Sequence, residues 1–226
     1  MKQLPAAVLW DMDGVLVDSE PLWTAAEVEL ATSLGGTWSA EIKAAVVGTR
    51  LDVAVSAILR FFGAPDSAER VAATSAWLLG RMVEQFAAEL PVVAGAAALH
   101  AALAAEGVPQ ALVSSSYRVF VDAVLALGVG PFATTVAGDE VQYGKPHPQP
   151  YLLPAELLGV DPARCVVLED SPPGVASGTA AGCAVVAVPT LPGVVVEPAA
   201  RRLVVATLED VDVAVLADLA VGAPAP

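Results

Sequence analysis

The sequence has little positive charge. Its 226 residues include 11 Lys and Arg against 25 Asp and Glu, so the formal net charge is −14. A surface this acidic repels phosphate backbones, and we therefore expect neither a nucleic-acid partner nor binding to an anionic membrane surface. An anionic substrate would need a local positive charge or a metal ion.

Cysteine is scarce as well. Cys165 and Cys183 each stand beside an apolar run and lack Cys-x-x-Cys spacing, which argues against a disulfide framework and against a metal or redox site. The first residues, MKQLPAAVLWD, have one lysine, a very short apolar run and then an acid, unlike a signal peptide. We expect a soluble, cytoplasmic protein that is a monomer by default.

Charge is missing altogether from residues 171–196, which raises the question of a membrane span. The stretch contains four prolines and four glycines, residues that interrupt a long helix. We therefore expect a helix, a turn, a strand and a loop there instead of a span. Apolar residues make up 56% of the chain, which is enough to bury a core and excludes a disordered tail.

Short apolar runs alternate with helical patterns along most of the chain. Three of the helical patterns end just before a glycine, which is a helix stop signal. This alternation predicts an α/β fold with a Rossmann-like parallel sheet and helices on both faces. The expected strands are 6–10, 110–113, 165–168 and 184–188, with 134–137 and 203–205 as further candidates. The expected helices are 96–106, 117–127 and 149–158.

A helical block interrupts this alternation after the first strand. Leucine or alanine recurs every four residues from Leu22 to Leu34, and residues 53–62 and 68–90 also have a helical pattern. Pro91 and Gly95 mark the expected return of the chain to the sheet. We therefore expect an α/β core from residues 1–16 and 94–226 and a helical insert from residues 17–93.

Polar side chains follow the three clearest strands at the point where each strand ends. Ligands of open α/β sheets bind at the carboxyl ends of the strands, so these side chains should converge at one edge. Carboxylates gathered there would repel one another unless a cation lay among them, and all-oxygen ligands suit Mg²⁺. The pairs are Asp11 with Asp13, Ser114 with Ser115, and Glu169 with Asp170.

A phosphate site fits the same edge. Ser114 is expected to open a helix, so its hydroxyl and nearby N–H groups could hold an anion, and Lys145 would add positive charge. A carboxylate beside such a site can act as a nucleophile and form an aspartyl-phosphate. A second carboxylate two residues away can supply and remove protons. Taken singly, each of these residues also has a plainer interpretation as a turn, cap or surface residue.

Four segments of the sequence resemble the four motifs of the haloacid dehalogenase-like hydrolase superfamily and follow one another in the same order as in that family. The resemblance covers essentially the whole chain and is to the branch that holds sugar-phosphate phosphatases and β-phosphoglucomutase. It implies that the helical insert is the small α-helical cap of that family. The segments are Asp11-Met-Asp-Gly with the stretch up to Trp23, Val-Ser114-Ser-Ser, Gly-Lys145-Pro-His-Pro and Leu-Glu169-Asp170-Ser-Pro-Pro-Gly.

The resemblance also implies a role for each motif residue. Asp11 would take the phosphoryl group, and Asp13 would protonate the leaving alkoxide and then activate water. The phosphoryl oxygens would be bound by Ser114, Ser115 and Lys145. The ligands of Mg²⁺ would be the side chains of Asp11 and Asp170 and the backbone carbonyl of Asp13, with Glu169 helping directly or through water.

Two cap residues are expected near the substrate. Glu20 lies close to the expected cap hinge, and Arg50 lies in Gly48-Thr49-Arg50, where the family places a substrate-specificity loop. Each has a structural alternative, because Glu20 belongs to a helix start and Arg50 could be a surface arginine.

The sequence thus predicts an enzyme, a Mg²⁺-dependent phosphatase for a small phosphomonoester such as a sugar or polyol phosphate. The alternative is a β-phosphoglucomutase. Against it, Trp23 stands where that branch has a histidine, and residues 44–144 contain no lysine for the cap. A dehalogenase would not need Asp13 or the Glu169-Asp170 pair. A non-catalytic phosphate-binding protein on the same fold would be expected to lose a motif residue, and none is lost.

Overall fold

Six parallel strands form one sheet at the centre of the protein. A computed structural model describes residues 3–86, 92–190 and 195–222 of the chain. The strand order is β3-β2-β1-β4-β5-β6, which confirms the α/β prediction, including both further candidate strands to within one residue. The strands are β1 Ala7–Asp11, β2 Gln110–Val113, β3 Thr134–Val136, β4 Cys165–Glu169, β5 Ala184–Ala187 and β6 Arg202–Val204.

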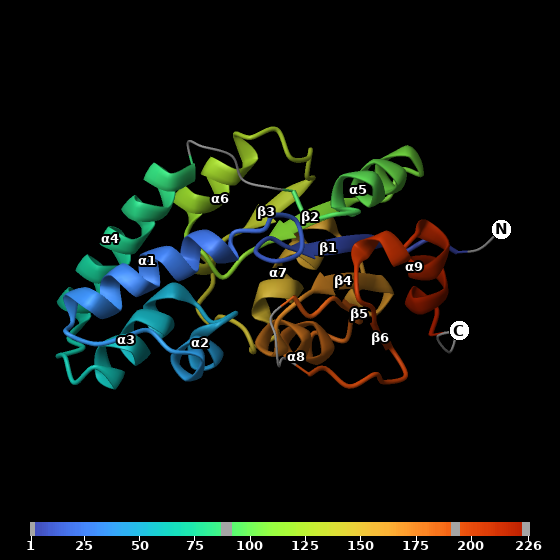
Figure 1. Cartoon of the computed structure of the whole chain (residues 1–226). Coiled ribbons are helices and arrows are strands. Elements are labelled where there is room, and N and C mark those ends of the chain that lie inside the picture. Colours follow the sequence, from blue (N-terminus) through green and yellow to red (C-terminus); the bar gives the residue numbers. More distant parts are fainter. Residues whose placement is uncertain (1–2, 87–91, 191–194, 223–226) are drawn as a thin grey trace.

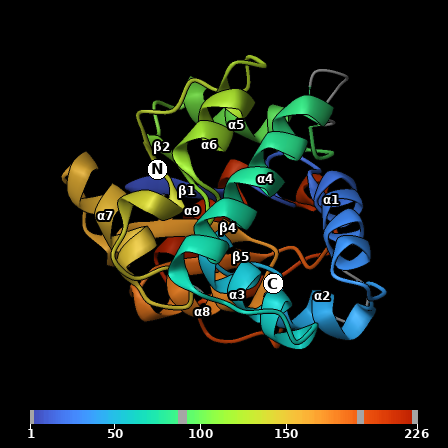
Figure 2. The same cartoon turned by 90° about the vertical axis from the view of Figure 1, so that its left-hand side faces the viewer.

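The sheet lies between two layers of helices (Figures 1 and 2). Alternate residues of its central strands pack against different layers. Val8 and Trp10 pack in one hydrophobic cluster with α5, α6 and α9, whereas Ala7 and Leu9 pack in another with α7 and α8. Burial on both faces explains why these strands are continuous apolar runs. The helices are α5 Ala96–Ala105, α6 Arg118–Leu125, α7 Gln149–Leu158, α8 Pro172–Ala180 and α9 Val213–Ala220. Short 3-10 helices are η1 Gly138–Glu140, η2 Pro162–Arg164 and η3 Leu208–Asp210.

Four helices between β1 and α5 gather at the carboxyl end of the sheet (Figure 1). Helix α3 packs on both α2 and α4, and α4 also packs on α1. Helix α2 is absent from the sequence-based prediction, since seven residues are too few for a clear period; Ser39 caps it by accepting a hydrogen bond from Ile42 N. The four are α1 Glu20–Ser33, α2 Ala40–Val46, α3 Leu51–Phe61 and α4 Ala68–Phe86.

The two connections between the sheet and these helices lie side by side. Val17 forms an antiparallel bridge with Val92, and Val93 N donates to Leu16 O at 3.0 Å. Gly95 directly precedes α5, as expected for the return of the chain. The other predicted return residue, Pro91, and the end of the predicted helix at residues 87–90 lie outside the described residues. The chain thus leaves and re-enters the sheet region through paired segments at residues 16–17 and 92–93, and the domain boundaries stay a prediction.

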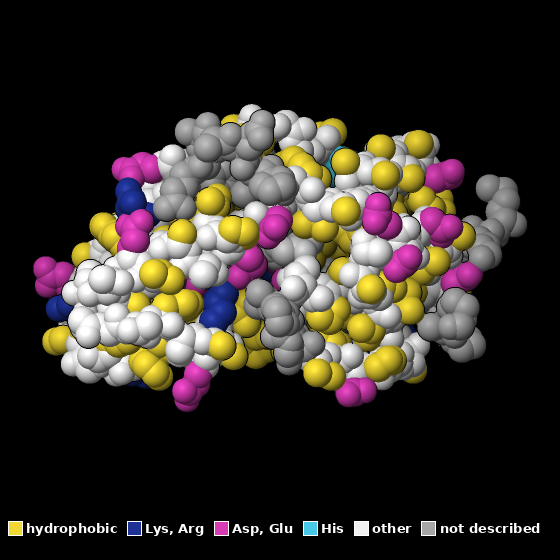
Figure 3. Space-filling view, viewed as in Figure 1, with side chains coloured by type: hydrophobic (Ala, Val, Ile, Leu, Met, Phe, Trp, Pro, Cys, Tyr) yellow, Lys and Arg dark blue, Asp and Glu magenta, His cyan; other side chains and the backbone are white. Residues whose placement is uncertain are grey.

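The surface in Figure 3 shows many acidic side chains and few basic ones, in keeping with the net charge of −14. Within the described ranges, no helix combines the length and apolarity that crossing a membrane requires. The uncharged stretch 171–196 forms α8, β5 and connecting loops, as predicted, with residues 191–194 outside the description.

Candidate active site

A tight turn after β1 brings two acidic segments together. Leu16 N donates to Met12 O at 3.0 Å and Gly14 N donates to Val17 O at 2.8 Å, so the chain folds back immediately after the strand. Gly14 has φ of +80°, and a Cβ there would lie 2.3 Å from Asp170 Oδ2. Only glycine therefore allows this turn to approach the end of β4 so closely.

Three buried carboxylates meet at the ends of β1 and β4. Asp11, Glu169 and Asp170 each offer an oxygen such that all three atoms lie within 4.8 Å of one another. Lys145 Nζ contacts Asp11 Oδ1 and lies 2.7 Å from Glu169 Oε1. Tyr151 donates its hydroxyl to the same Glu169 oxygen at 2.8 Å. The cluster thus contains three carboxylates and one ammonium group.

Glu169 is held by the protein at both oxygens. Its Oε1 accepts from Lys145 and Tyr151, and its Oε2 accepts from the backbone N–H groups of Asp170 at 2.9 Å and Ser171 at 3.0 Å. The Ser171 hydroxyl donates to Oε2 as well, at 3.0 Å. In this arrangement Glu169 orients Lys145 toward Asp11, and Asp11 and Asp170 are the carboxylates with fewer protein donors.

The electrostatics of the cluster favour a bound cation. Burial and the charge of Glu169 raise the pKa of Asp11 well above its ordinary value, with Lys145 opposing. Burial and Glu169 likewise raise the pKa of Asp170 to about 8, against a hydrogen bond from Thr190. Burial alone would lower the pKa of Lys145, but Asp11 and Glu169 outweigh it and raise the pKa, so Lys145 stays charged. One ammonium group is too little charge for three carboxylates, and the all-oxygen donor set fits a divalent metal.

Asp13 lies apart from that cluster in a ring of donors. Its Oδ1 accepts from the Ser19 hydroxyl and from Trp23 Nε1 at 3.3 Å. Its Oδ2 accepts from the hydroxyls of Ser114 at 3.1 Å and Ser116 at 3.4 Å. Ser19 stands at the N-cap of α1 but makes no side-chain capping bond, since its hydroxyl is directed to Asp13. Residues from the sheet and from the helical block therefore share this one carboxylate.

The serines after β2 are placed differently from expectation. Helix α6 begins at Arg118, so Ser114 lies in the preceding turn and does not open the helix. Its hydroxyl oxygen accepts from Ser116 N at 2.9 Å while donating to Asp13. Ser115 donates to Gly48 O at 3.2 Å, which links this turn to the loop before α3. Ser115 and Ser116, together with Lys145, line the cavity in front of the acidic cluster.

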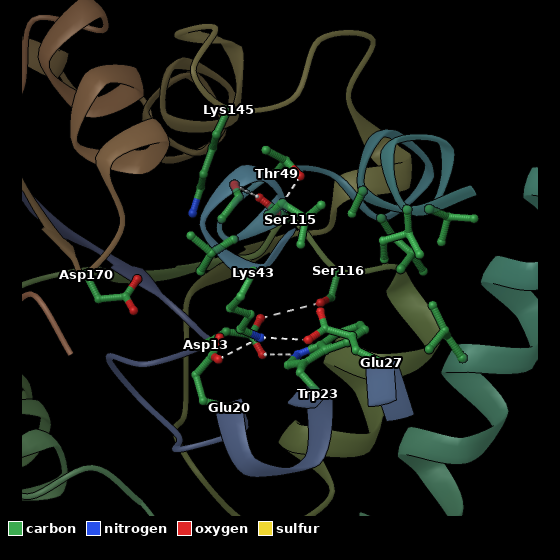
Figure 4. Close-up of a pocket in the computed structure, with 18 of the residues that line it drawn as sticks. Asp13, Glu20, Trp23, Glu27, Lys43, Thr49, Ser115, Ser116, Lys145 and Asp170 are labelled. Carbon is green, nitrogen blue, oxygen red and sulfur yellow. Dashed lines mark hydrogen bonds and ion pairs between the residues drawn. The ribbon is translucent and has the colours of Figure 1, made fainter. Parts of the chain in front are cut away.

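The wall of this cavity on the helical block carries an ion-pair cluster (Figure 4). Glu20, Trp23 and Glu27 lie on one face of α1, and Lys43 reaches them from α2, with Nζ 2.8 Å from Glu20 Oε2 and 2.9 Å from Glu27 Oε2. Neither Lys43 nor Glu27 is among the predicted site residues. The available signal is the i, i+3, i+7 spacing of polar and aromatic residues after the first motif, together with a sequence that has only three lysines.

Lys43 also changes one argument about the alternative activity. The absence of lysine from residues 44–144 counts against a mutase, yet Lys43 provides a lysine of the helical block in the cavity. Trp23, in the place of a histidine, lines the cavity as well. The case against a mutase therefore depends on Trp23 and not on a missing lysine.

Of the two expected substrate residues, the structure brings one into the cavity. Glu20 lines it. Arg50 forms a two-point ion pair with Asp52, at 2.6 Å for each contact, and donates to the carbonyls of Val141 at 3.4 Å and Gln142 at 3.2 Å. Among the described lining residues are its neighbours 48, 49 and 51 but not Arg50 itself. Arg50 bridges the helical block and the loop before Lys145.

Comparisons with known proteins agree with this geometry. The family described as haloacid dehalogenase-like hydrolase matches residues 5–182. The chain is 33% identical over 195 residues to a bifunctional riboflavin kinase/FMN phosphatase of Arabidopsis thaliana, covering 85% of this chain and half the length of that protein. It is 35% identical over 188 residues to hexitol phosphatase B of Escherichia coli, covering 81% of this chain and 83% of that one.

Among solved structures, a mutant of CbbY from Rhodobacter sphaeroides in complex with xylulose-(1,5)bisphosphate superposes with a TM-score of 0.81 at 26% identity. The superposition covers 91% of this chain and 95% of that one. Both the sequence relatives and the fold thus lead to one family. The chain belongs to the haloacid dehalogenase-like hydrolases.

Proposed function

We propose that the protein is a metal-dependent phosphatase that hydrolyses a small phosphomonoester, a sugar or polyol phosphate, through an aspartyl-phosphate on Asp11. The phosphatase prediction agrees with the named relatives, which include hexitol and FMN phosphatases. The observation that carries the proposal is the buried set of Asp11, Glu169 and Asp170 with Lys145. Of this set, Asp11, Asp170 and Lys145 line the cavity that Asp13 also lines. This set combines a nucleophile, a cation site and a second carboxylate for proton transfer.

Asp11 acts as the nucleophile in this proposal. Its carboxylate attacks phosphorus, the bond to the substrate oxygen breaks, and the phosphoryl group is carried on Asp11 until water displaces it. Lys145, in contact with Asp11, places positive charge beside the phosphoryl oxygens and reduces their repulsion from the carboxylate. Ser114 and Ser115, in the turn after β2, donate their hydroxyls to Asp13 and to Gly48 O, and would turn these hydroxyls to the phosphoryl oxygens when a substrate binds.

Asp13 moves the proton. It gives a proton to the leaving alkoxide oxygen and then takes one from the attacking water. Its four donors, from Ser19, Trp23, Ser114 and Ser116, fix its carboxyl group on the side of the cavity that faces the helical block. The leaving alcohol would therefore lie between Asp13 and that block.

We assign the metal as Mg²⁺ because every candidate ligand is an oxygen atom. Asp11, the backbone carbonyl of Asp13 and Asp170 would hold it, with Glu169 bound directly or through water. When bound, Mg²⁺ supplies positive charge that lowers the cost of bringing a phosphate to three carboxylates.

The division of the chain and its assembly belong to the same proposal. Residues 17–93 would act as a cap that closes over the site, and residues 1–16 and 94–226 would form the core. Closure sheds water around the phosphoryl group and opening releases the product. We further propose that the enzyme is cytoplasmic and monomeric. Light scattering of the purified protein gives its molar mass and so tests whether it is a monomer.

Phosphorus NMR of the protein with a mixture of sugar and polyol phosphates, including β-glucose 1-phosphate, tests the function. We expect inorganic phosphate to grow with Mg²⁺ and to stop growing with EDTA. Conversion of the 1-phosphate to the 6-phosphate with little free phosphate would identify a mutase instead. No change in any ester would favour a binding protein.

A further inference from the structure

Glu20, Glu27 and Lys43 form a compact ion-pair cluster on the part of the cavity wall that the helical block supplies, and we call it the cap triad. Lys43 Nζ lies 2.8 Å from Glu20 and 2.9 Å from Glu27, and the Lys43 and Glu27 side chains are only 15% and 9% exposed. All three residues line the cavity that Asp11 and Asp13 also line (Figure 4). With the phosphate held at Asp11, residues that the helical block adds to the same cavity would meet the remainder of the substrate.

The cap triad carries no surplus positive charge. Glu27 and Glu20 raise the pKa of Lys43 above its ordinary value although burial opposes them, so the ammonium stays charged. Burial raises the pKa of Glu27 to about 7, against Lys43. With Glu27 protonated or ionised, the triad is neutral or carries one negative charge. The other cation among the described lining residues, Lys145, is already in contact with Asp11 and Glu169.

This charge balance has a consequence for the substrate. A second phosphate or a carboxylate on the ester would meet two glutamates and no free cation at this wall, which is unfavourable at low local dielectric. A hydroxyl group both donates and accepts a hydrogen bond. The triad offers both partners, because the carboxylates accept and the Lys43 ammonium has three N–H donors, of which one bonds Glu27 Oε2. Glu20 Oε2 lies 2.8 Å from the same ammonium as an ion-pair partner and is a buried oxygen without a hydrogen bond from any described residue.

The surroundings of the triad fit the carbon chain of such a molecule. The remainder of this wall is largely apolar. A hydroxyl group of the substrate therefore finds its hydrogen-bond partners on this wall mainly at the triad. The apolar lining residues are Val46, Val47, Leu51, Ala54, Val55, Ile58 and Leu78.

We propose that the cap triad binds hydroxyl groups of the substrate's alcohol portion and selects against phosphate esters that carry a second anionic group. This inference rests on the proposed phosphatase function and specifies its substrate class as uncharged polyol or sugar monophosphates. Glu20, Glu27 and Lys43 are then residues that determine specificity, separate from the residues that perform the chemistry.

The unmodified protein provides the first test. We would measure kcat/KM with Mg²⁺ for glucitol 6-phosphate, n-hexyl phosphate, phosphoglycolate and fructose 1,6-bisphosphate. We expect glucitol 6-phosphate to exceed each of the others by about tenfold or more, since each of them lacks hydroxyls for the triad or adds an anionic group. Equal or higher values for n-hexyl phosphate or for the two more anionic esters would overturn the proposal.

A pair of matched variants locates the selectivity. At pH 8, where Glu27 is mostly ionised, Glu27→Gln removes one charge from the triad and keeps its shape. The ratio of kcat/KM for glucitol 6-phosphate over phosphoglycolate should then fall about tenfold, mainly through KM. Glu29→Gln makes the same change two residues along α1, where Glu29 pairs with Arg81 at 2.8 Å outside the cavity lining, and should leave the ratio as it is. An unchanged ratio in Glu27→Gln would overturn the role of the triad.

The same data separate the two proposals. Phosphate release from none of the esters would overturn the phosphatase function and, with it, the triad's role. Release without discrimination among the esters would overturn the triad's role alone. If Glu27→Gln fails to fold, the ester series with the unmodified protein still decides.

Discussion

At the scale of single residues, the proposed chemistry depends on Asp11, a buried aspartate whose ionised form is unfavourable. Burial and the neighbouring carboxylates raise the pKa of Asp11, and the positive charge of Lys145, in contact with Asp11, acts to lower it. We expect Asp11→Asn to lower the rate of phosphate release by at least about 10³-fold, because an amide cannot accept the phosphoryl group. The rate is measured from initial phosphate release, with circular dichroism to confirm folding.

The matched control for that variant is Asp122→Asn, at an exposed position on α6 where Asp122 pairs with Arg118. It makes the same chemical change far from the cavity lining and should keep the parent rate. Parent-like turnover in Asp11→Asn would show that another group is the nucleophile.

In the proposed site, Asp170 would be one of the ligands that set the affinity for the metal. In the parent, Mg²⁺ should raise the melting temperature by binding the folded state, and Asp170→Asn should weaken the binding by about tenfold or more. Since burial and Glu169 raise the pKa of Asp170 to about 8 without metal, binding must displace a proton, and the parent's affinity should increase from pH 6 to 8. Calorimetric titration checks both, and a pH-independent affinity in the parent would contradict the assignment.

Glu27 should make the stability of the folded protein depend on pH, in addition to its proposed role in specificity. Its carboxyl has a pKa of about 7 in the folded protein and an ordinary value near 4.5 when unfolded. The unfolded chain therefore loses this proton first as the pH rises from 4.5 to 7, and the contribution of Glu27 to stability falls across that window. Glu27→Gln should flatten the fall of the urea midpoint over this range.

Glu29→Gln is again the comparison. A hydrogen bond from Arg81 lowers the pKa of Glu29, so this carboxylate is ionised in both states over most of the window. Its slope should match that of the parent, and a flattened slope in Glu29→Gln alone would contradict the assignment to Glu27.

At the scale of elements, α5 starts at a backbone position that only glycine tolerates. Gly95 has φ of +83°, and a Cβ there would lie 2.6 Å from the backbone nitrogen of Glu209 in η3. Gly107, just after α5, has φ of +69°, and a Cβ added there would have no atom of another described residue, apart from its two chain neighbours, within 4 Å. Both Gly→Ala variants should lose about 1 kcal/mol to the left-handed backbone, and Gly95→Ala should lose about 1–3 kcal/mol more to the clash. Urea unfolding measures the difference, and equal losses would contradict it.

Elements differ in how far sequence predicts them. The strands were predictable because parallel strands buried on both faces leave short apolar runs, such as residues 110–113, between glycine and polar residues. Helix α2 was not, since its seven residues give no period, and its position is decided by packing on α3. Lys43 could not be predicted as a site residue for the same reason, because it reaches the cavity through a contact between α2 and α1.

The edge of the sheet was the predictable part of the site. Polar residues after β1, β2 and β4 must converge once the strands are parallel neighbours, so Asp11, Glu169 and Asp170 could be grouped from sequence. The orientation of side chains could not be obtained in that way. Arg50 pairs with Asp52, two residues along the chain, and also donates to two backbone carbonyls of the core. The carbonyl contacts are tertiary, and no local pattern encodes them.

At the scale of the whole molecule, the net charge of −14 opposes the approach of any phosphate ester. Salt shortens the Debye length from about 30 Å at 0.01 M to about 10 Å at 0.1 M, which screens this long-range repulsion. We expect the KM for glucitol 6-phosphate to fall between these salt concentrations at fixed Mg²⁺. Sucrose of equal osmolarity should leave KM unchanged, and a KM that rises with salt would show that local attraction dominates.

The paired crossing at Val17 and Val92 makes the helical block an exchangeable cassette. The two connecting segments are hydrogen-bonded to each other in antiparallel fashion, like the two strands of a hairpin. The helical block takes the place of the hairpin's loop. A block of another length or sequence could be spliced between these two valines while β1 and its turn kept their places. If the helical block selects the substrate as proposed, such an exchange would change the specificity and leave the acidic cluster at the sheet edge in place.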